Sequence, residues 1–207
     1  MQIQNLNEDQ VKEIYYRHIC EDFPADERKP YWKIQQYLRK GKYLCLGMFG
    51  QEGELLVYAF FMKTANVQDP LLLDYYAVVS NKRSHGYGST FLRLLGDHIT
   101  QNIVGEVEDP SATRVAEERT NRQRRIGFYL KNGFVDTGVR CKFFGVQYCM
   151  MCKMHGAQEN LDIRAIRKFY DMVYKNAFPA NRLRFWKKRE RCSMVKISKK
   201  IIMYKKL

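Results

Sequence analysis

Residues 74–95, DYYAVVSNKRSHGYGSTFLRLL, pass from a strand through a glycine-bearing loop into a helix. Strand-forming residues run from Asp74 to Val79 and stop at Ser80 and Asn81. Apolar residues then recur at helical spacing, at Phe91, Leu92, Leu95 and Ile99. Glycine lets a ligand approach the backbone closely, and the N–H groups and dipole at a helix start attract anions. The pattern therefore predicts a phosphate-binding turn.

The spacing of the glycines narrows the kind of turn. A dinucleotide fingerprint requires a third glycine where Phe91 stands, and a Walker A loop requires a lysine directly after its last glycine. Neither is present, which leaves Arg83-x-x-Gly86-x-Gly88 after a strand. From this loop alone, the alternative is an ordinary strand-to-helix turn, in which the glycines are needed only for the backbone conformation and no ligand binds.

A second segment lies about 40 residues downstream of the loop, at Arg124–Phe134. It predicts a short basic helix that carries Phe128 and Tyr129, because Asn132-Gly133 is a helix-stop signal and a strand follows from Phe134.

In this order, the two segments resemble the [RQ]-x-x-G-x-[GA] loop and the R-x-x-FY-x-x-x-GF segment of the GNAT acetyltransferase superfamily. The resemblance covers about residues 5–154. It implies an α/β fold with a GNAT-like mixed central sheet, splayed open in the middle, flanked by helices and holding acetyl-CoA in the splay. It also implies that acetyl-CoA is the co-substrate and that no metal is used.

The resemblance assigns the pyrophosphate of acetyl-CoA to one run of the chain: Arg83, Ser84, His85, Gly86, Tyr87, Gly88 and Ser89. Ser84 departs from the family, which commonly has glycine there, and His85 stands where a basic residue is common. Arg83 has two open roles, a phosphate contact or packing of its stem across the loop. A bulged strand would place a backbone N–H of Val78 or Val79 against the thioester carbonyl.

The catalytic residues are also implied by the resemblance. Tyr129 matches the tyrosine that protonates the departing thiolate, with simple packing beside Phe128 as the alternative. Glu106 and Asp74 are the candidate general bases, because carboxylates in central strands are unusual unless they are paired or line a cleft. The alternative is that the strand carboxylates only form salt bridges with the basic helix at Arg122–Arg125.

Other patterns predict the rest of the domain. Asn7–Gln10 indicates a capping box that opens a first helix. Strands are predicted over Tyr43–Phe49, Leu55–Lys63 and Leu71–Val79. Cys149 and Cys152 fall in a strand-like run, where their side chains point to opposite faces, so buried thiols are favoured over a metal site.

The resemblance implies a GNAT acetyltransferase domain at residues 1–155. Residues 156–207 lie beyond the usual GNAT length, and we expect them to form a C-terminal helix and basic tail that pack on this domain. Residues 181–207 hold eleven Lys or Arg and one acid, out of a net charge of +14. A solvated cationic surface is favoured there, and a nucleic-acid contact is the alternative. The apolar face of residues 161–178 would serve a homodimer as well as a monomer.

The resemblance implies an N-acetyltransferase that moves an acetyl group from acetyl-CoA to a primary amine by direct attack on the thioester. The acceptor is an amine-bearing small molecule or a peptide. The alternative is a non-catalytic GNAT-scaffold binding protein that contacts nucleic acid or a protein through its basic tail. The N-terminus lacks a signal-peptide pattern and no apolar run has the ~18 residues of a membrane helix, so we expect a cytoplasmic protein without a membrane partner.

Overall fold

The computed structural model describes residues 1–143, 146–155 and 163–177. These residues form two compact units. Unit 1 contains residues 1–65 and 71–100. Unit 2 contains residues 66–70 and the described residues from Gln101 onward. The predicted domain boundary at 155–156 stays a prediction, since residues 156–162 and 178–207 lie outside the described ranges.

Unit 1 is built on an antiparallel sheet in the order β1-β2-β3-β4. Its strands are β1 (Gln2–Asn5), β2 (Tyr43–Phe49), β3 (Leu55–Met62) and β4 (Leu71–Val78). Every residue of β4 is buried. A strand that is covered on both faces carries a continuous apolar run rather than an alternating one, which explains the Leu71–Val78 sequence.

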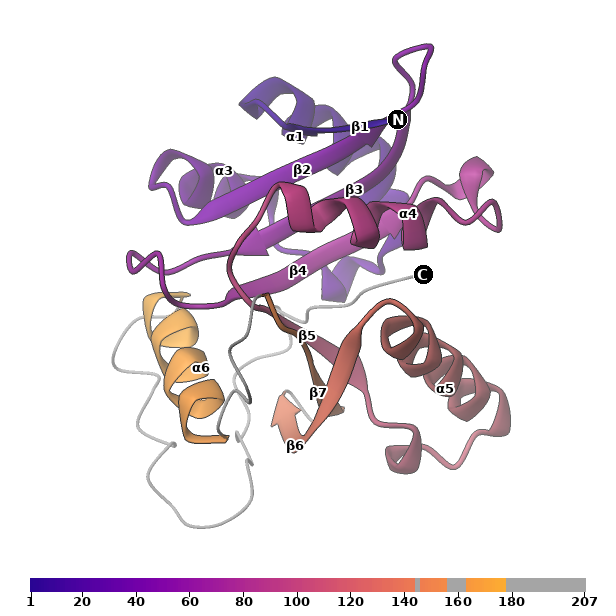
Figure 1. Cartoon of the computed structure of the whole chain (residues 1–207), viewed down its shortest axis with the longest axis vertical. Helices are drawn as coiled ribbons and strands as arrows, with labels where there is room; N and C mark the ends of the chain where they lie inside the picture. The colour runs from indigo at the N-terminus through magenta and orange to yellow at the C-terminus, as the bar shows by residue number, and fades with distance from the viewer. Residues whose placement is uncertain (144–145, 156–162, 178–207) are drawn as a thin grey trace. The chain divides into compact units, whose positions relative to one another are not determined.

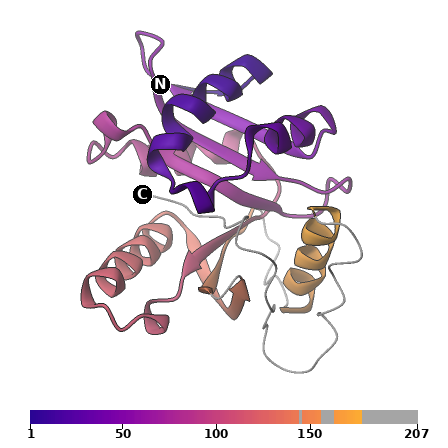
Figure 2. The same cartoon turned by 180° about the vertical axis from the view of Figure 1, so that it is seen from behind.

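Helices cover both faces of this sheet, with α4 on one face and the N-terminal helices on the other (Figures 1 and 2). The N-terminal elements are α1 (Glu8–Ile14), a π-helical turn (Tyr15–Ile19), α2 (Cys20–Asp22), a 3-10 turn (Ala25–Glu27) and α3 (Tyr31–Arg39). On the other face, a 3-10 turn (Ser80–Lys82) leads into α4 (Tyr87–Leu94), which is followed by a 3-10 turn (Leu95–Asp97).

The predicted capping box is confirmed at the start of α1. The Gln10 N–H donates to the Asn7 side-chain oxygen, and the Asn7 N–H donates to the Gln10 side-chain oxygen, both at 2.9 Å. The π-helical turn and the short strand β1 were not predicted, because a four-residue edge strand and one extra residue in a helical turn leave no clear periodicity.

Unit 2 contains three antiparallel strands in the order β5-β7-β6, flanked by α5 and α6 (Figure 1). Its elements are β5 (Ile103–Glu108), a 3-10 turn (Pro110–Ala112), α5 (Ala116–Lys131), β6 (Phe134–Phe143), β7 (Val146–Lys153) and α6 (Ile163–Ala177). The predicted stop of α5 is confirmed, with Asn132 as its C-cap and Gly133 at φ 82°.

Cys149 and Cys152 on β7 are buried free thiols, as predicted. Burial raises the pKa of Cys149 to about 11 and that of Cys152 to about 12, so both are protonated and unreactive near neutrality. Across the described ranges, each helix is too short or too polar to cross a bilayer.

Candidate active site

The loop between β4 and α4 has two residues in the left-handed backbone region. Gly86, the N-cap of α4, has φ 79°, and a Cβ placed there would meet nothing within 4 Å. The backbone angle, and not crowding, therefore explains this glycine. Ser84 has φ 66° and is the one non-glycine residue with positive φ in the described part of the chain. This conformation accounts for the glycine that GNAT proteins commonly have at the same place.

The start of α4 presents backbone donors. The first intrahelical bond runs from the Thr90 N–H to the Gly86 carbonyl at 3.0 Å, and no side chain caps the helix. The N–H groups of Tyr87, Gly88 and Ser89 accordingly have no acceptor within the helix. The Tyr76 hydroxyl of β4 donates to the Gly88 carbonyl at 2.8 Å and anchors this turn to the sheet. Such a helix start is suited to a phosphate.

The register of β4 distinguishes the two predicted thioester donors. The Val79 N–H donates to the Leu56 carbonyl of β3 at 3.0 Å. Because backbone groups alternate in direction along a strand, the N–H and carbonyl of Val78 point away from β3. The Arg83 side chain donates to the Val78 carbonyl on that side, at 3.2 Å. Of the two residues, Val78 has the orientation that a ligand-facing donor needs.

Arg83 is held by unit 1 itself. Its guanidinium forms an ion pair with Asp22, which lies 61 residues earlier and is 4% exposed. The Tyr58 hydroxyl donates to the other Asp22 oxygen at 2.8 Å. These contacts favour the interpretation in which Arg83 braces the loop over the one in which it contacts phosphate.

Asp74 lies at a bulge in β4. Phe60 pairs with Tyr75 and Phe61 with Leu73, so Asp74 is the extra residue on its strand. The fully buried Asp74 carboxylate accepts from the Lys29 ammonium at 2.7 and 2.9 Å and from the Tyr43 hydroxyl. Since both oxygens already accept hydrogen bonds from a buried ammonium, Asp74 is poorly placed to take a further proton.

The second candidate base lies in unit 2. Glu106 is 6% exposed and sits opposite Met150 of β7. Its carboxylate accepts a hydrogen bond from the Tyr170 hydroxyl of α6 at 2.8 Å. Two residues further along β5, Glu108 forms ion pairs with Arg122 at 3.2 Å and Arg125 at 3.0 Å. The predicted salt bridges to the basic helix are therefore present at Glu108.

Tyr129 lies in the last turn of α5 and is 1% exposed. Its ring packs edge-on against Phe128 and Phe134, with centroids at 5.6 and 4.9 Å. Its buried hydroxyl makes no hydrogen bond with any residue that the structure describes. Burial raises its pKa, against a smaller opposing effect of Arg125, which keeps the phenol protonated. Buried hydroxyls are nearly always partnered, so this one is suited to meet a ligand.

Several solved structures share the backbone arrangement. A Bacteroides thetaiotaomicron protein assigned to the GNAT acetyltransferases matches with a TM-score of 0.63 and 22% identity, over 84% of this chain and 98% of its own. The chain has the GNAT fold. The ribosomal-protein-S18-alanine N-acetyltransferase of Escherichia coli matches with a TM-score of 0.54 and 19% identity, over 77% of this chain and 97% of its own. The Vibrio cholerae spermidine N-acetyltransferase, in complex with CoA and spermine, matches with a TM-score of 0.55 and 10% identity, over 73% of this chain and 93% of its own.

The GNAT fold confirms the predicted fold class. By contrast, no family model and no curated protein matches the sequence. In the described residues, no group of three or more His, Cys, Asp or Glu side chains is arranged to hold a metal ion.

Four polar residues that contact candidate site residues, or the partners of these, within their own unit were not predicted from the sequence: Asp22, Lys29, Tyr58 and Tyr170. Asp22 and Lys29 lie 61 and 45 residues from their partners, and Tyr170 lies 64 residues from Glu106. Of these four residues, only Tyr170 could have been found from the sequence. It lies on the apolar face of the predicted C-terminal helix, where its hydroxyl is the unusual polar group.

Proposed function

We propose that this protein is an acetyl-CoA-dependent N-acetyltransferase that acts by direct attack of a primary amine on the thioester. The observation that carries the proposal is the start of α4 on a GNAT fold. There, Gly86 in the left-handed conformation opens a helix whose first N–H groups have no helical acceptor. A pyrophosphate is the ligand that this arrangement fits best.

The proposed reaction gives each candidate residue one role. The Val78 N–H donates to the thioester carbonyl oxygen and stabilises the negative charge that develops when the amine nitrogen bonds to the carbonyl carbon. As the C–S bond breaks, the Tyr129 hydroxyl gives its proton to the departing thiolate. The nitrogen loses its extra proton to a carboxylate. Burial raises the pKa of Tyr129, so the hydroxyl carries its proton at the start of each turnover, as an acid must.

We propose Glu106 as the general base, with Asp74 as the second candidate. Glu106 is buried and accepts a hydrogen bond from the Tyr170 hydroxyl, which orients its carboxylate. Asp74 is neutralised by Lys29 at 2.7 Å. Loss of the acid limb of the pH–rate profile in Glu106→Gln would support the first choice. Loss of this acid limb in Asp74→Asn, but not in Glu106→Gln, would support Asp74 as the base.

The acceptor class is a primary amine on a small molecule or a peptide. Structures with the same fold are named for spermidine, for an aminoglycoside and for the alanine of a ribosomal protein. These acceptors differ in size but share an amine nucleophile. We therefore propose the reacting group, a primary amine, and not a particular molecule.

Two glycines form a matched pair for testing acetyl-CoA binding. Gly86 and Gly53 both have φ 79°, and a Cβ at either would meet nothing within 4 Å. Alanine at either position should therefore cost a similar amount, about 1 kcal/mol of stability. We expect acetyl-CoA to raise the melting temperature of the wild type and of Gly53→Ala. Gly86→Ala should lose most of this shift, because its methyl group enters the space next to the proposed pyrophosphate.

Two outcomes would count against the proposal. A wild-type protein that acetyl-CoA does not stabilise at millimolar concentration would contradict the binding site. Equal stabilisation of both alanine variants would place the ligand away from the loop.

The alternative function rests on residues 181–207, which lie outside the described ranges. It would gain support if RNA bound in a salt-sensitive way and acetyl-CoA had no effect.

A further inference from the structure

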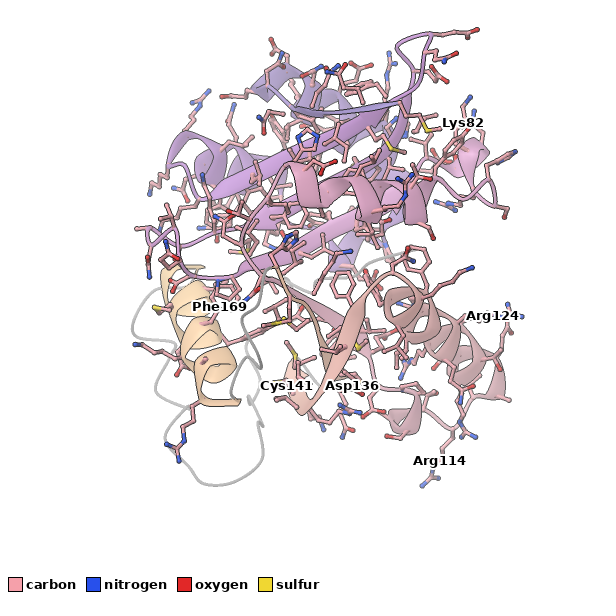
Figure 3. The ribbon with its side chains drawn as sticks, in the orientation of Figure 1. Lys82, Arg114, Arg124, Asp136, Cys141 and Phe169 are labelled. Atoms are coloured by element: carbon pink, nitrogen blue, oxygen red, sulfur yellow. The ribbon has the colours of Figure 1, made fainter. Side chains whose placement is uncertain are left out.

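Helix α6 brings a buried aromatic pair to unit 2. Phe169, which Figure 3 labels on α6, is 2% exposed, and Tyr170 and Val173 are each 3% exposed. The rings of Phe169 and Tyr170 meet edge-on, with their centroids 6.0 Å apart. One face of α6 is therefore part of a buried core.

Tyr170 also makes a polar contact within this core. Its hydroxyl donates to Glu106 Oε1 at 2.8 Å, between side chains that are both buried. A hydrogen bond to an ionised acceptor is shorter and stronger than one between neutral groups, and it favours the charged form of the carboxyl. A carboxylate buried in a strand without such donors would tend to bind a proton and could not act as a base.

We propose that Tyr170 is a positioning residue for the general base, so that the C-terminal helix is part of the catalytic machinery and not only a covering element. The inference rests on the proposed function of Glu106. Tyr170 holds one carboxylate oxygen in place and keeps the group ionised, and Glu106 then accepts the proton of the incoming amine.

Other ionisable groups lie near Glu106 along β5 and near its partner Met150 along β7. Glu108 is on the same strand and is paired with Arg122 and Arg125 of α5. Cys149 and Cys152 lie on β7, and burial raises the pKa of both thiols, so they stay neutral. Tyr170→Phe removes one donor and leaves these groups and the ring packing in place.

The test compares pH profiles of kcat/KM for the amine, at saturating acetyl-CoA, in four full-length proteins: wild type, Glu106→Gln, Tyr170→Phe and Phe169→Leu. Loss of the Tyr170 hydroxyl raises the pKa of the base. We expect the acid limb of Tyr170→Phe to move to higher pH by about one unit. Phe169→Leu removes packing from the same helix, so its melting temperature should fall while its acid limb stays where it is.

The outcomes separate this inference from the proposed function. An acid limb that persists in Glu106→Gln would contradict the assignment of the base. An acid limb that disappears in Glu106→Gln but is unmoved in Tyr170→Phe would overturn the role of Tyr170 alone. If Tyr170→Phe does not fold, a carbon-13 titration of the Glu106 carboxyl in the wild type decides the question. Titration below the usual glutamate range supports the inference, and titration above it overturns it.

Discussion

Asp74 in unit 1 and Glu106 in unit 2 are both buried carboxylates on strands, but their partners differ in charge. Asp74 is bound by the ammonium of Lys29, whereas Glu106 accepts from the neutral hydroxyl of Tyr170. An ion pair neutralises a carboxylate, while a hydrogen bond from a hydroxyl orients it. A buried strand carboxylate therefore supports structure in unit 1, while the one in unit 2 is the residue that we propose for proton transfer.

The hydroxyl groups of the two units show the same contrast. Tyr58 donates to Asp22 at 2.8 Å within the network that holds Arg83. Tyr129 is just as buried, yet its hydroxyl has no hydrogen-bond partner among the described residues. Polar groups of unit 1 thus brace the loop, whereas the Tyr129 hydroxyl of unit 2 has no partner among the described residues and is the group that we propose as the acid.

The largest effect is expected from removing the cation of the Asp74 ion pair. Lys29→Met leaves a buried charge without its counter-ion and should cost about 3–5 kcal/mol in the free energy of unfolding. Lys33→Met is the matched control. Lys33 contacts the rings of Trp32 and Tyr37 but forms no ion pair among the described residues, so we expect a loss of about 1 kcal/mol or less. Urea denaturation of both variants measures their free energies of unfolding. Equal decreases in the two variants would contradict a special role of the Lys29–Asp74 ion pair.

Removing single hydroxyls should give changes of opposite sign. Tyr58→Phe leaves Asp22 with one donor fewer and should cost about 1.5–3 kcal/mol. Tyr129→Phe removes an unsatisfied buried hydroxyl and should stabilise the protein by about 1 kcal/mol. It should also lower kcat by about 100-fold through loss of the acid, with the acetyl-CoA affinity unchanged. Destabilisation together with unchanged turnover in Tyr129→Phe would show that the hydroxyl is structural.

The smallest effect concerns the strained residue of the loop. Ser84→Gly relieves the positive φ of 66° and should stabilise the protein by about 0.5–1 kcal/mol, after allowing for the greater freedom of glycine in the unfolded chain. Ser80 lies in the same loop without a positive φ, so Ser80→Gly should destabilise by a similar amount. Thermal unfolding compares the two. Stabilisation by both variants would mean that backbone strain at Ser84 is not the cause.

Local patterns predicted the parts of the site that lie close together in the chain. The loop at Arg83–Ser89 and the stop of α5 at Asn132 each depend on a few neighbouring residues whose backbone needs are specific. The capping box at Asn7 was predictable for the same reason.

Contacts between distant residues could not be predicted in this way. No spacing rule joins Asp22 to Arg83, or Lys29 to Asp74, because such pairs depend on how strands and helices are packed. The directions of the Val78 and Val79 N–H groups also depend on strand register, since Val79 N–H donates to Leu56 of β3 and Val78 N–H points away from β3. The sequence can identify a carboxylate as a candidate base, but only the folded structure shows which groups form hydrogen bonds or ion pairs with it.

Acetyl transfer itself is tested most directly by mixing the full-length protein with acetyl-CoA and a series of amines that includes spermidine, an aminoglycoside and a peptide with a free N-terminus. Release of free CoA thiol and the mass of the amine product are followed together. The proposed function predicts that at least one amine gains a single acetyl group for each thiol released, at a rate that falls sharply in Tyr129→Phe. Acetyl-CoA that binds to the protein but releases no thiol above the spontaneous rate with any amine would contradict it.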